Sequence, residues 1–184
     1  MKATGIVRRI DDLGRVVIPK EIRRTMRIRE GDPLEIYTDR EGEVIFKKYS
    51  PIGELTGFAL QYADTLHKIC SMAVIICDRD AIIAASGVSR KEYFDKRLSD
   101  ELERIIESRS LYLWNENSPK LPAIDGGSHF VSCAMPIISE GDIIGCVASL
   151  SENNDDKPHD SIGGEAESKL IMTAASFLGR QLES

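Results

Sequence analysis

The net charge of this chain changes sign near residue 50, which divides the sequence into two parts of different chemistry. Residues 1–29 carry nine Lys or Arg side chains against three acidic ones, whereas residues 51–184 carry twelve basic against twenty-one acidic side chains. A cationic segment suits a phosphate backbone, and the acidic remainder would be repelled by one. We therefore expect a nucleic-acid-binding module joined to a second module of another kind.

The lengths of the two parts limit how each can fold. A chain of 184 residues can form one domain or two. The basic part, about fifty residues long, is marginal as an independent core and is expected to complete its core by oligomerising. Only the short segment 49–53 (Tyr-Ser-Pro-Ile-Gly) is a plausible boundary. We predict a domain at 1–51 and a second at 52–184.

The basic part begins with a predicted β-hairpin. Two β-branched runs, 4–10 and 15–18, flank the turn sequence Asp-Asp-Leu-Gly. Without a bulge, the register would pair Ile10 with Arg15. Arg8 and Arg15 would then lie on one face of the hairpin, an arrangement that a slip of one residue would undo.

A short helix and a second hairpin follow. Pro19 suits the first turn of a helix over 20–27, in which Ile22 and Met26 would face inward. Two further β-rich runs between residues 34 and 47 flank an Asp-Arg-Glu-Gly turn. The predicted order is therefore hairpin, short helix, hairpin.

These residues carry a specific resemblance. The strings Asp-Leu-Gly-Arg-Val-Val-Ile-Pro at 12–19, Gly-Asp-Pro-Leu-Glu-Ile at 31–36 and Val-Ile-Phe-Lys-Lys-Tyr at 44–49 closely resemble the AbrB family of bacterial transition-state regulators. The match covers essentially all of residues 1–50. It implies a swapped-hairpin dimer, in which two chains interlace their hairpins into one small β-barrel.

The resemblance also implies that this domain binds double-stranded DNA. The DNA-contacting arginines of the family map onto four positions here, and Arg9 is adjacent, so the expected DNA-binding residues are Arg8, Arg9, Arg15, Arg23 and Arg24. We expect phosphate contacts and readout of groove shape to dominate. By spacing alone, these arginines could equally be solvating charges on a small surface.

The acidic part alternates helical and β-rich patterns. Its predicted helices and strands are, in order, a helix at 54–70, strands at 72–78 and 81–86, a helix at 98–109 with Ser99 as N-cap, a strand at 111–114, a hairpin of 130–138 with 142–150, and a helix at 165–182. Gly145 would let its strand pack closely against a neighbour. The fold class is therefore α+β.

This arrangement resembles a GAF domain over about residues 54–182. The resemblance implies an antiparallel sheet with helices on one face and a ligand cavity on the other, lined from 74–86, 111–130 and 131–147. The chain lacks a cyclic-nucleotide signature and has no cysteine in a bilin or haem setting. We therefore expect no cofactor, and an unidentified small-molecule effector remains open.

The two long helices of the acidic part, at 54–70 and 165–182, each carry an apolar stripe. Either both stripes pack on their own sheet, or they pair across subunits as a helical bundle. The second arrangement would give each chain two association surfaces. The chain would then form a dimer through its N-terminal domain and a tetramer through its GAF-like domains.

Other functional classes find little support in the sequence. The four cysteines lack zinc-site spacing and are expected to be small buried hydrophobes, so no metal site is predicted. No catalytic set stands out, and we expect no enzyme activity. No apolar run approaches the roughly 18 residues of a membrane span, so we expect a cytoplasmic protein with no membrane partner.

Over its whole length the chain resembles regulators of spore-forming bacilli. This resemblance implies a protein that activates and represses transcription during spore development. The alternative is the antitoxin of a toxin–antitoxin pair, because related swapped-hairpin domains carry toxin-binding tails.

Overall fold

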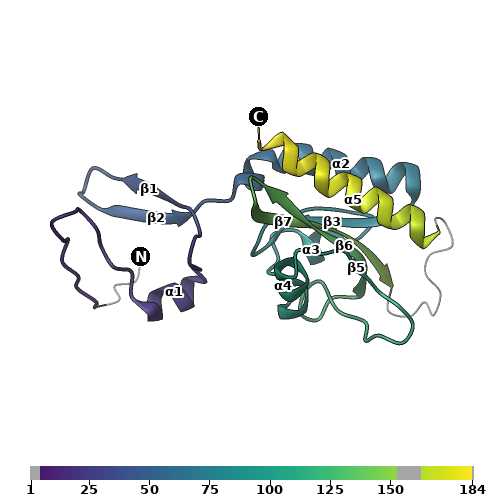
Figure 1. Ribbon diagram of the computed structural model, residues 1–184, viewed down its shortest axis with the longest axis horizontal. Helices are drawn as coiled ribbons and strands as arrows, with labels where there is room; N and C mark the ends of the chain where they lie inside the picture. Colours follow the sequence, from purple (N-terminus) through teal and green to yellow (C-terminus); the bar gives the residue numbers. More distant parts are fainter. Residues whose placement is uncertain (1–4, 153–162, 184) are drawn as a thin grey trace. The chain divides into compact units, whose positions relative to one another are not determined.

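A computed structural model describes residues 5–152 and 163–183 of the chain (Figure 1). The chain divides into two compact units, Met1–Tyr49 and Ser50–Ser184. Helices and antiparallel strands occur in both, so the predicted α+β class is confirmed. The two units are described separately below.

The first unit contains the predicted short helix and second hairpin. Helix α1 (Lys20–Met26) begins directly after Pro19 and ends at Arg27, which has a left-handed backbone conformation (φ 53°). Strand β1 (Leu34–Thr38) pairs antiparallel with β2 (Val44–Lys48). Both predictions from local sequence signals are therefore confirmed.

The first hairpin differs from its prediction. Residues 5–19 contain a turn but no assigned strand. The turn closes with a hydrogen bond from the Asp11 N–H to the Arg15 carbonyl at 3.1 Å, and Gly14 adopts φ 76°. Asp11, not Ile10, therefore lies opposite Arg15. A pairing continued from this turn would put Arg8 and Arg15 on opposite faces, so the expected register was wrong by one residue.

The physical reason for this register is the Asp11 side chain. Its Oδ1 accepts hydrogen bonds from the backbone N–H groups of Leu13, at 3.1 Å, and Arg15, at 2.7 Å. These bonds stabilise a three-residue turn in which Gly14 takes the left-handed position, the usual device of a three-residue hairpin loop. The sequence interpretation had assumed an unbulged two-strand ladder instead.

The first unit has no buried core of its own. In residues 5–49, none of the Ile, Leu, Val, Met, Phe or Tyr side chains is buried. Val7 is 85% exposed and Ile36 62% exposed, and Met26, expected to face inward, is 58% exposed. A soluble monomer rarely leaves so much apolar surface in water. The apolar side chains that would form a core in this unit are therefore left exposed in the single chain.

The second unit is built on a five-stranded antiparallel sheet. Its strand order is β4-β3-β7-β6-β5. The strands are β3 (Ala73–Cys77), β4 (Ile82–Ser86), β5 (Tyr112–Leu113), β6 (His129–Ser139) and β7 (Asp142–Glu152). At Gly145 an added Cβ would lie 2.1 Å from the Cys77 carbonyl oxygen, which confirms the expected close packing of β7 on β3.

Two long helices cover one face of this sheet (Figure 1). They are α2 (Thr56–Cys70), which follows the 3₁₀ helix η1 (Pro51–Leu55), and α5 (Gly164–Gln181). Small side chains, including Ala59, Ala63 and Ala174, are fully buried in this core beside larger aliphatic ones such as Ile171 and Leu178. Both helices therefore pack on their own sheet, which was the first of the two expectations for their apolar stripes.

The opposite face of the sheet is also covered by helices, and here the GAF-based expectation of helices on one face was wrong. Helices α3 (Arg90–Tyr93) and α4 (Asp100–Glu107) lie there with the loop at 115–128. A second core forms on this side, with Tyr93 and Leu102 fully buried in it. Strand β3 buries side chains on both faces, so both faces need an apolar cover. This GAF-like arrangement is the predicted fold class with one additional helical layer.

Candidate nucleic-acid interface

All five predicted DNA-binding arginines belong to the first unit, and all five are exposed. Arg8 and Arg9 lie on the extended segment before the turn, Arg15 follows the turn, and Arg23 and Arg24 lie in the last turn of α1. Except for Arg15, none of the five makes an ion pair with a residue that the structure describes. The guanidinium groups of the other four arginines are therefore open to an anionic partner.

Helix α1 presents its two arginines from a well-anchored end. Cationic side chains in the last turn of a helix are favoured by the negative end of the helix dipole. The Lys48 ammonium donates a hydrogen bond to the Arg27 carbonyl at 3.0 Å and lies 3.6 Å from the Asp32 carboxylate. Strand β2 thus holds the C-terminal end of α1, and with it Arg23 and Arg24. Sequence reasoning did not identify this role of Lys48.

Arg15 is the one arginine of the five with a defined partner. Its Nε donates to Asp11 Oδ2 at 2.7 Å, in addition to the backbone bond that Asp11 Oδ1 accepts from Arg15. The backbone N–H and then the side chain of Arg15 hold the pKa of the Asp11 carboxyl below its ordinary value. The carboxylate is therefore charged at neutral pH.

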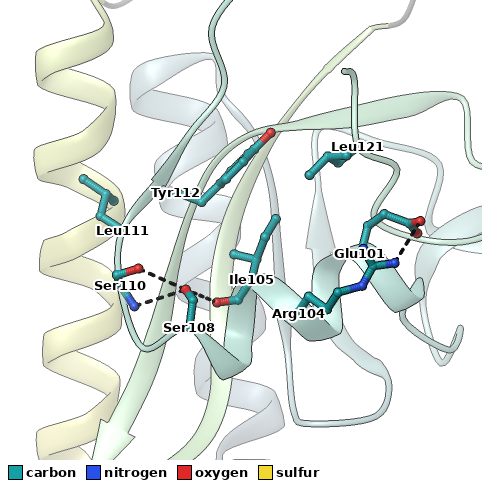
Figure 2. A pocket seen from close by; sticks show the side chains of 8 residues that line it. All are labelled: Glu101, Arg104, Ile105, Ser108, Ser110, Leu111, Tyr112 and Leu121. Atoms are coloured by element: carbon teal, nitrogen blue, oxygen red, sulfur yellow. Dashed lines mark hydrogen bonds and ion pairs between the residues drawn. The ribbon is translucent and has the colours of Figure 1, made fainter. Parts of the chain in front are cut away.

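The second unit contains a pocket of about 260 Å³ beside helix α4 (Figure 2). Its lining residues come from α4, from β5 and the residues before it, and from the 115–128 loop: Glu101, Arg104, Ile105, Ser108, Ser110, Leu111, Tyr112 and Leu121. Of the three segments predicted to line a cavity, only 111–130 contributes to this pocket. The expected contributions of 74–86 and 131–147 were wrong for this pocket.

The reason is that the space between the sheet and α4 is filled. Tyr93, Leu102 and Ile124 occupy it as core side chains. The pocket therefore lies beside α4, with Glu101, Arg104, Ile105 and Ser108 on one side of the helix. Their spacing of three and four residues was visible in the sequence, but the polar positions among them carried no signal that distinguished a pocket from a solvated face.

One residue that lines this pocket carries an unusual polar group. The hydroxyl of Tyr112 is buried and has no hydrogen-bond partner among the described residues. Burial raises the pKa of Tyr112 above its ordinary value. An unpartnered buried hydroxyl is costly, by about 1–3 kcal/mol, so this position calls for a partner that the described chain does not supply.

The cysteines, the other side chains that could carry reactive or metal-binding chemistry, lie in structural surroundings. Cys77, Cys133 and Cys146 are buried and Cys70 is partly buried, all as free thiols. Burial raises the pKa of Cys133 to about 12. Residues 5–152 and 163–183 contain no group of three or more His, Cys, Asp or Glu placed to hold a metal ion. In the same ranges, no helix combines the length and hydrophobicity needed to cross a bilayer.

Comparison with known proteins identifies the family. The family model described as stage V sporulation protein T C-terminal, transcription factor, matches residues 54–183. Stage V sporulation protein T of Bacillus subtilis (strain 168) is 53% identical over 188 residues, which cover 100% of this chain and 99% of that protein. The chain belongs to the stage V sporulation protein T family. The resemblance to regulators of spore-forming bacilli is therefore confirmed.

The first unit of this chain also matches a second group of known proteins. A model described as antidote-toxin recognition MazE, bacterial antitoxin, matches residues 7–53. The transition state regulatory protein AbrB of Bacillus subtilis (strain 168) is 65% identical over 51 residues, 28% of this chain and 52% of that protein. The AbrB-type identity of the N-terminal segment is thus confirmed.

The second unit also resembles a solved structure of an enzyme. The type II free methionine-R-sulfoxide reductase from Thermoplasma acidophilum is 13% identical and has a TM-score of 0.52, over 71% of this chain and 94% of that one. At this level of identity the likeness shows the fold alone. It gives no reason to assign reductase chemistry to this family member.

Proposed function

We propose that this protein is a sporulation transcription regulator that binds double-stranded DNA through an interlaced N-terminal dimer. It would act as both activator and repressor, in the cytoplasm, with DNA contacts from Arg8, Arg9, Arg15, Arg23 and Arg24. The family match over the whole length supports the regulatory role, and the AbrB-type segment supports the DNA-binding role.

One observation supports the dimer above all others. The first unit buries none of its large apolar side chains, although its sequence has the apolar pattern of a folded domain. A second copy with the same exposed surface is a natural cover, because identical chains that exchange hairpins bury matching faces. Interlacing would also bring the arginines of two chains into one array.

The dimer makes a quantitative prediction for DNA affinity. Four arginines per chain map onto the family's contact positions, which gives eight in a dimer. If most of them neutralise phosphates, log K should fall with log salt concentration at a slope of roughly −5 to −7, from about 0.9 per phosphate. The double variant Arg23→Gln, Arg24→Gln removes four charges per dimer and should reduce this slope by about 3 to 4.

The test is fluorescence anisotropy of the full-length protein on an AT-rich duplex between about 50 and 200 mM salt. Arg40→Gln is the matched control, since Arg40 is an exposed arginine in the turn of the second hairpin, outside the proposed array. Its slope should match that of the unmodified protein. A slope near zero for the unmodified protein would exclude phosphate contact as the basis of binding.

For the second unit we propose self-association through helices α2 and α5. Phe58, Tyr62 and Phe177 form an aromatic cluster across these helices, with centroid distances of 5.7 Å for Phe58–Phe177 and 5.8 Å for Tyr62–Phe177. Phe58 and Phe177 are both exposed. A second copy packing on this cluster would join two DNA-binding dimers into a tetramer.

Light scattering of the full-length protein checks this assembly. Phe177→Ser should convert the tetramer to a dimer, because it removes the centre of the aromatic cluster. Ile69→Ser is the control, since Ile69 is an exposed apolar residue of α2 that lies outside the cluster. A tetramer that survives Phe177→Ser would contradict this surface.

The pocket beside α4 is our candidate for the effector site. The Arg104–Glu101 pair among its lining residues, 3.5 Å apart, could orient the charged groups of a small molecule. Native mass spectrometry of protein purified from its own host tests for such a molecule. Leu121→Trp, which fills the pocket, should abolish its retention.

An antitoxin role is less well supported. The MazE-type match stops at residue 53, and the following 54–183 match a transcription-factor family instead. Co-purification of a small toxin with the full-length protein would favour the antitoxin alternative.

A further inference from the structure

Asp11 is an acidic residue in the middle of the basic segment, next to a residue proposed to bind DNA. A carboxylate at this position opposes binding to a polyanion by Coulomb repulsion. If Asp11 had no other role in DNA binding, its neutralisation would tighten the complex. The contacts of Asp11 indicate a different role.

Both carboxylate oxygens of Asp11 are used. Oδ1 accepts the backbone N–H groups of Leu13, at 3.1 Å, and Arg15, at 2.7 Å, and Oδ2 accepts the Arg15 side-chain Nε–H at 2.7 Å. The backbone of Asp11 and Arg15 is joined as well, by the 3.1 Å bond that closes the turn. Arg15 is therefore held by its main chain and by its guanidinium group to the same residue.

The Nε contact leaves most of the guanidinium group available. An arginine side chain has five N–H donors in a planar fork, and Asp11 engages one of them. One N–H of each terminal nitrogen points away from Nε, and these two donors form the edge that binds a doubly accepting group bidentately. The Arg15 side chain is 70% exposed, so this edge is open to solvent.

We propose that Asp11 is a positioning residue that fixes the plane of the Arg15 guanidinium for bidentate contact with DNA. The inference rests on the proposed DNA-binding role of Arg15. A free arginine side chain loses rotamer freedom when it binds, and the bond to Asp11 restricts that freedom before DNA arrives. The bidentate acceptor is either the O6/N7 edge of guanine or a phosphate group, which share this geometry.

The experiment compares two neighbouring charge changes in the full-length protein. Asp11→Asn keeps an amide oxygen for the backbone bonds of the turn but removes the charged partner of Arg15 Nε. Asp12→Asn makes the same change of charge at an exposed position whose side chain makes no hydrogen bond or ion pair with a described residue. Asp12→Asn should tighten DNA binding slightly, whereas Asp11→Asn should weaken it about tenfold, the scale of one lost charge-assisted hydrogen bond.

A second pair of variants separates positioning from a merely structural role. In an Arg15→Lys background the Nε–H is absent, so adding Asp11→Asn should no longer weaken binding and should tighten it slightly, as Asp12→Asn does. If Asp11 only maintained the turn, Asp11→Asn would weaken binding equally in both backgrounds. That result would overturn the proposal.

The same measurements distinguish this inference from the proposed function. If Arg15→Lys leaves DNA affinity unchanged, the assignment of Arg15 to the interface fails. If Arg15→Lys weakens binding but Asp11→Asn does not, only the positioning role fails. Loss confined to a preferred duplex, with binding to a mixed-sequence duplex unchanged, identifies guanine as the acceptor, and equal loss on both identifies phosphate.

Discussion

Replacing Ser99 by alanine should destabilise the second unit more than most single-hydroxyl deletions would. Ser99 is fully buried. Its Oγ accepts the Leu102 N–H at 3.1 Å as the N-cap of α4, and it donates to the Pro122 carbonyl at 2.6 Å. One hydroxyl therefore caps the helix and also ties the 115–128 loop to it.

The expected loss can be worked from these two bonds. Loss of a serine N-cap costs about 1 kcal/mol. Leaving the Pro122 carbonyl without its donor adds about 1–3 kcal/mol if water does not reach it. We expect Ser99→Ala to lower the free energy of unfolding by about 2–4 kcal/mol, a large share of a typical domain stability of about 5–15 kcal/mol.

Trp114 provides the assay. It is the single tryptophan of the chain and packs edge-on against Phe130 with ring centroids 4.9 Å apart, so its fluorescence reports unfolding of this unit in denaturant. Ser108→Ala is the matched control at the other end of α4, where the exposed hydroxyl donates to the Ile105 carbonyl at 2.7 Å. Its loss should stay within about 0.5 kcal/mol. Equal losses for the two variants would refute the reasoning.

Two further predictions concern the core of the same unit. Gly145→Ala should destabilise the second unit by about 1–3 kcal/mol or more. The new Cβ would meet the Cys77 carbonyl oxygen at 2.1 Å and force β7 away from β3. A denaturation midpoint equal to that of the unmodified protein would contradict this prediction. The Cys133 thiol, whose pKa burial raises from 9.0 to about 12, should stay protonated in the folded protein at pH values where the unfolded thiol has ionised. Its contribution to stability is therefore complete below about pH 9 and is lost as pH rises toward 12, so Cys133→Ala should flatten the fall in stability over that range, as measured by denaturant titrations at each pH.

Features set by neighbouring residues were predictable from the sequence. Pro19 marks the start of α1, alternating apolar residues and a polar turn mark the β1–β2 hairpin, and Ser99 followed by acids marks the start of α4. These signals act within a few residues, so they do not depend on the rest of the fold. The match of the first fifty residues to AbrB-type regulators was predictable for the same reason, because it rests on short sequence motifs.

Only the tertiary structure decided which groups meet. The first turn closes through the Asp11 side chain, which moves the register by one residue and pairs Asp11 with Arg15. The second helical layer forms because the strands bury both of their faces, a long-range property that periodicity in one segment does not report. The pocket beside α4 likewise depends on how the 115–128 loop and β5 pack against that helix, and such contacts join residues that are distant in the sequence.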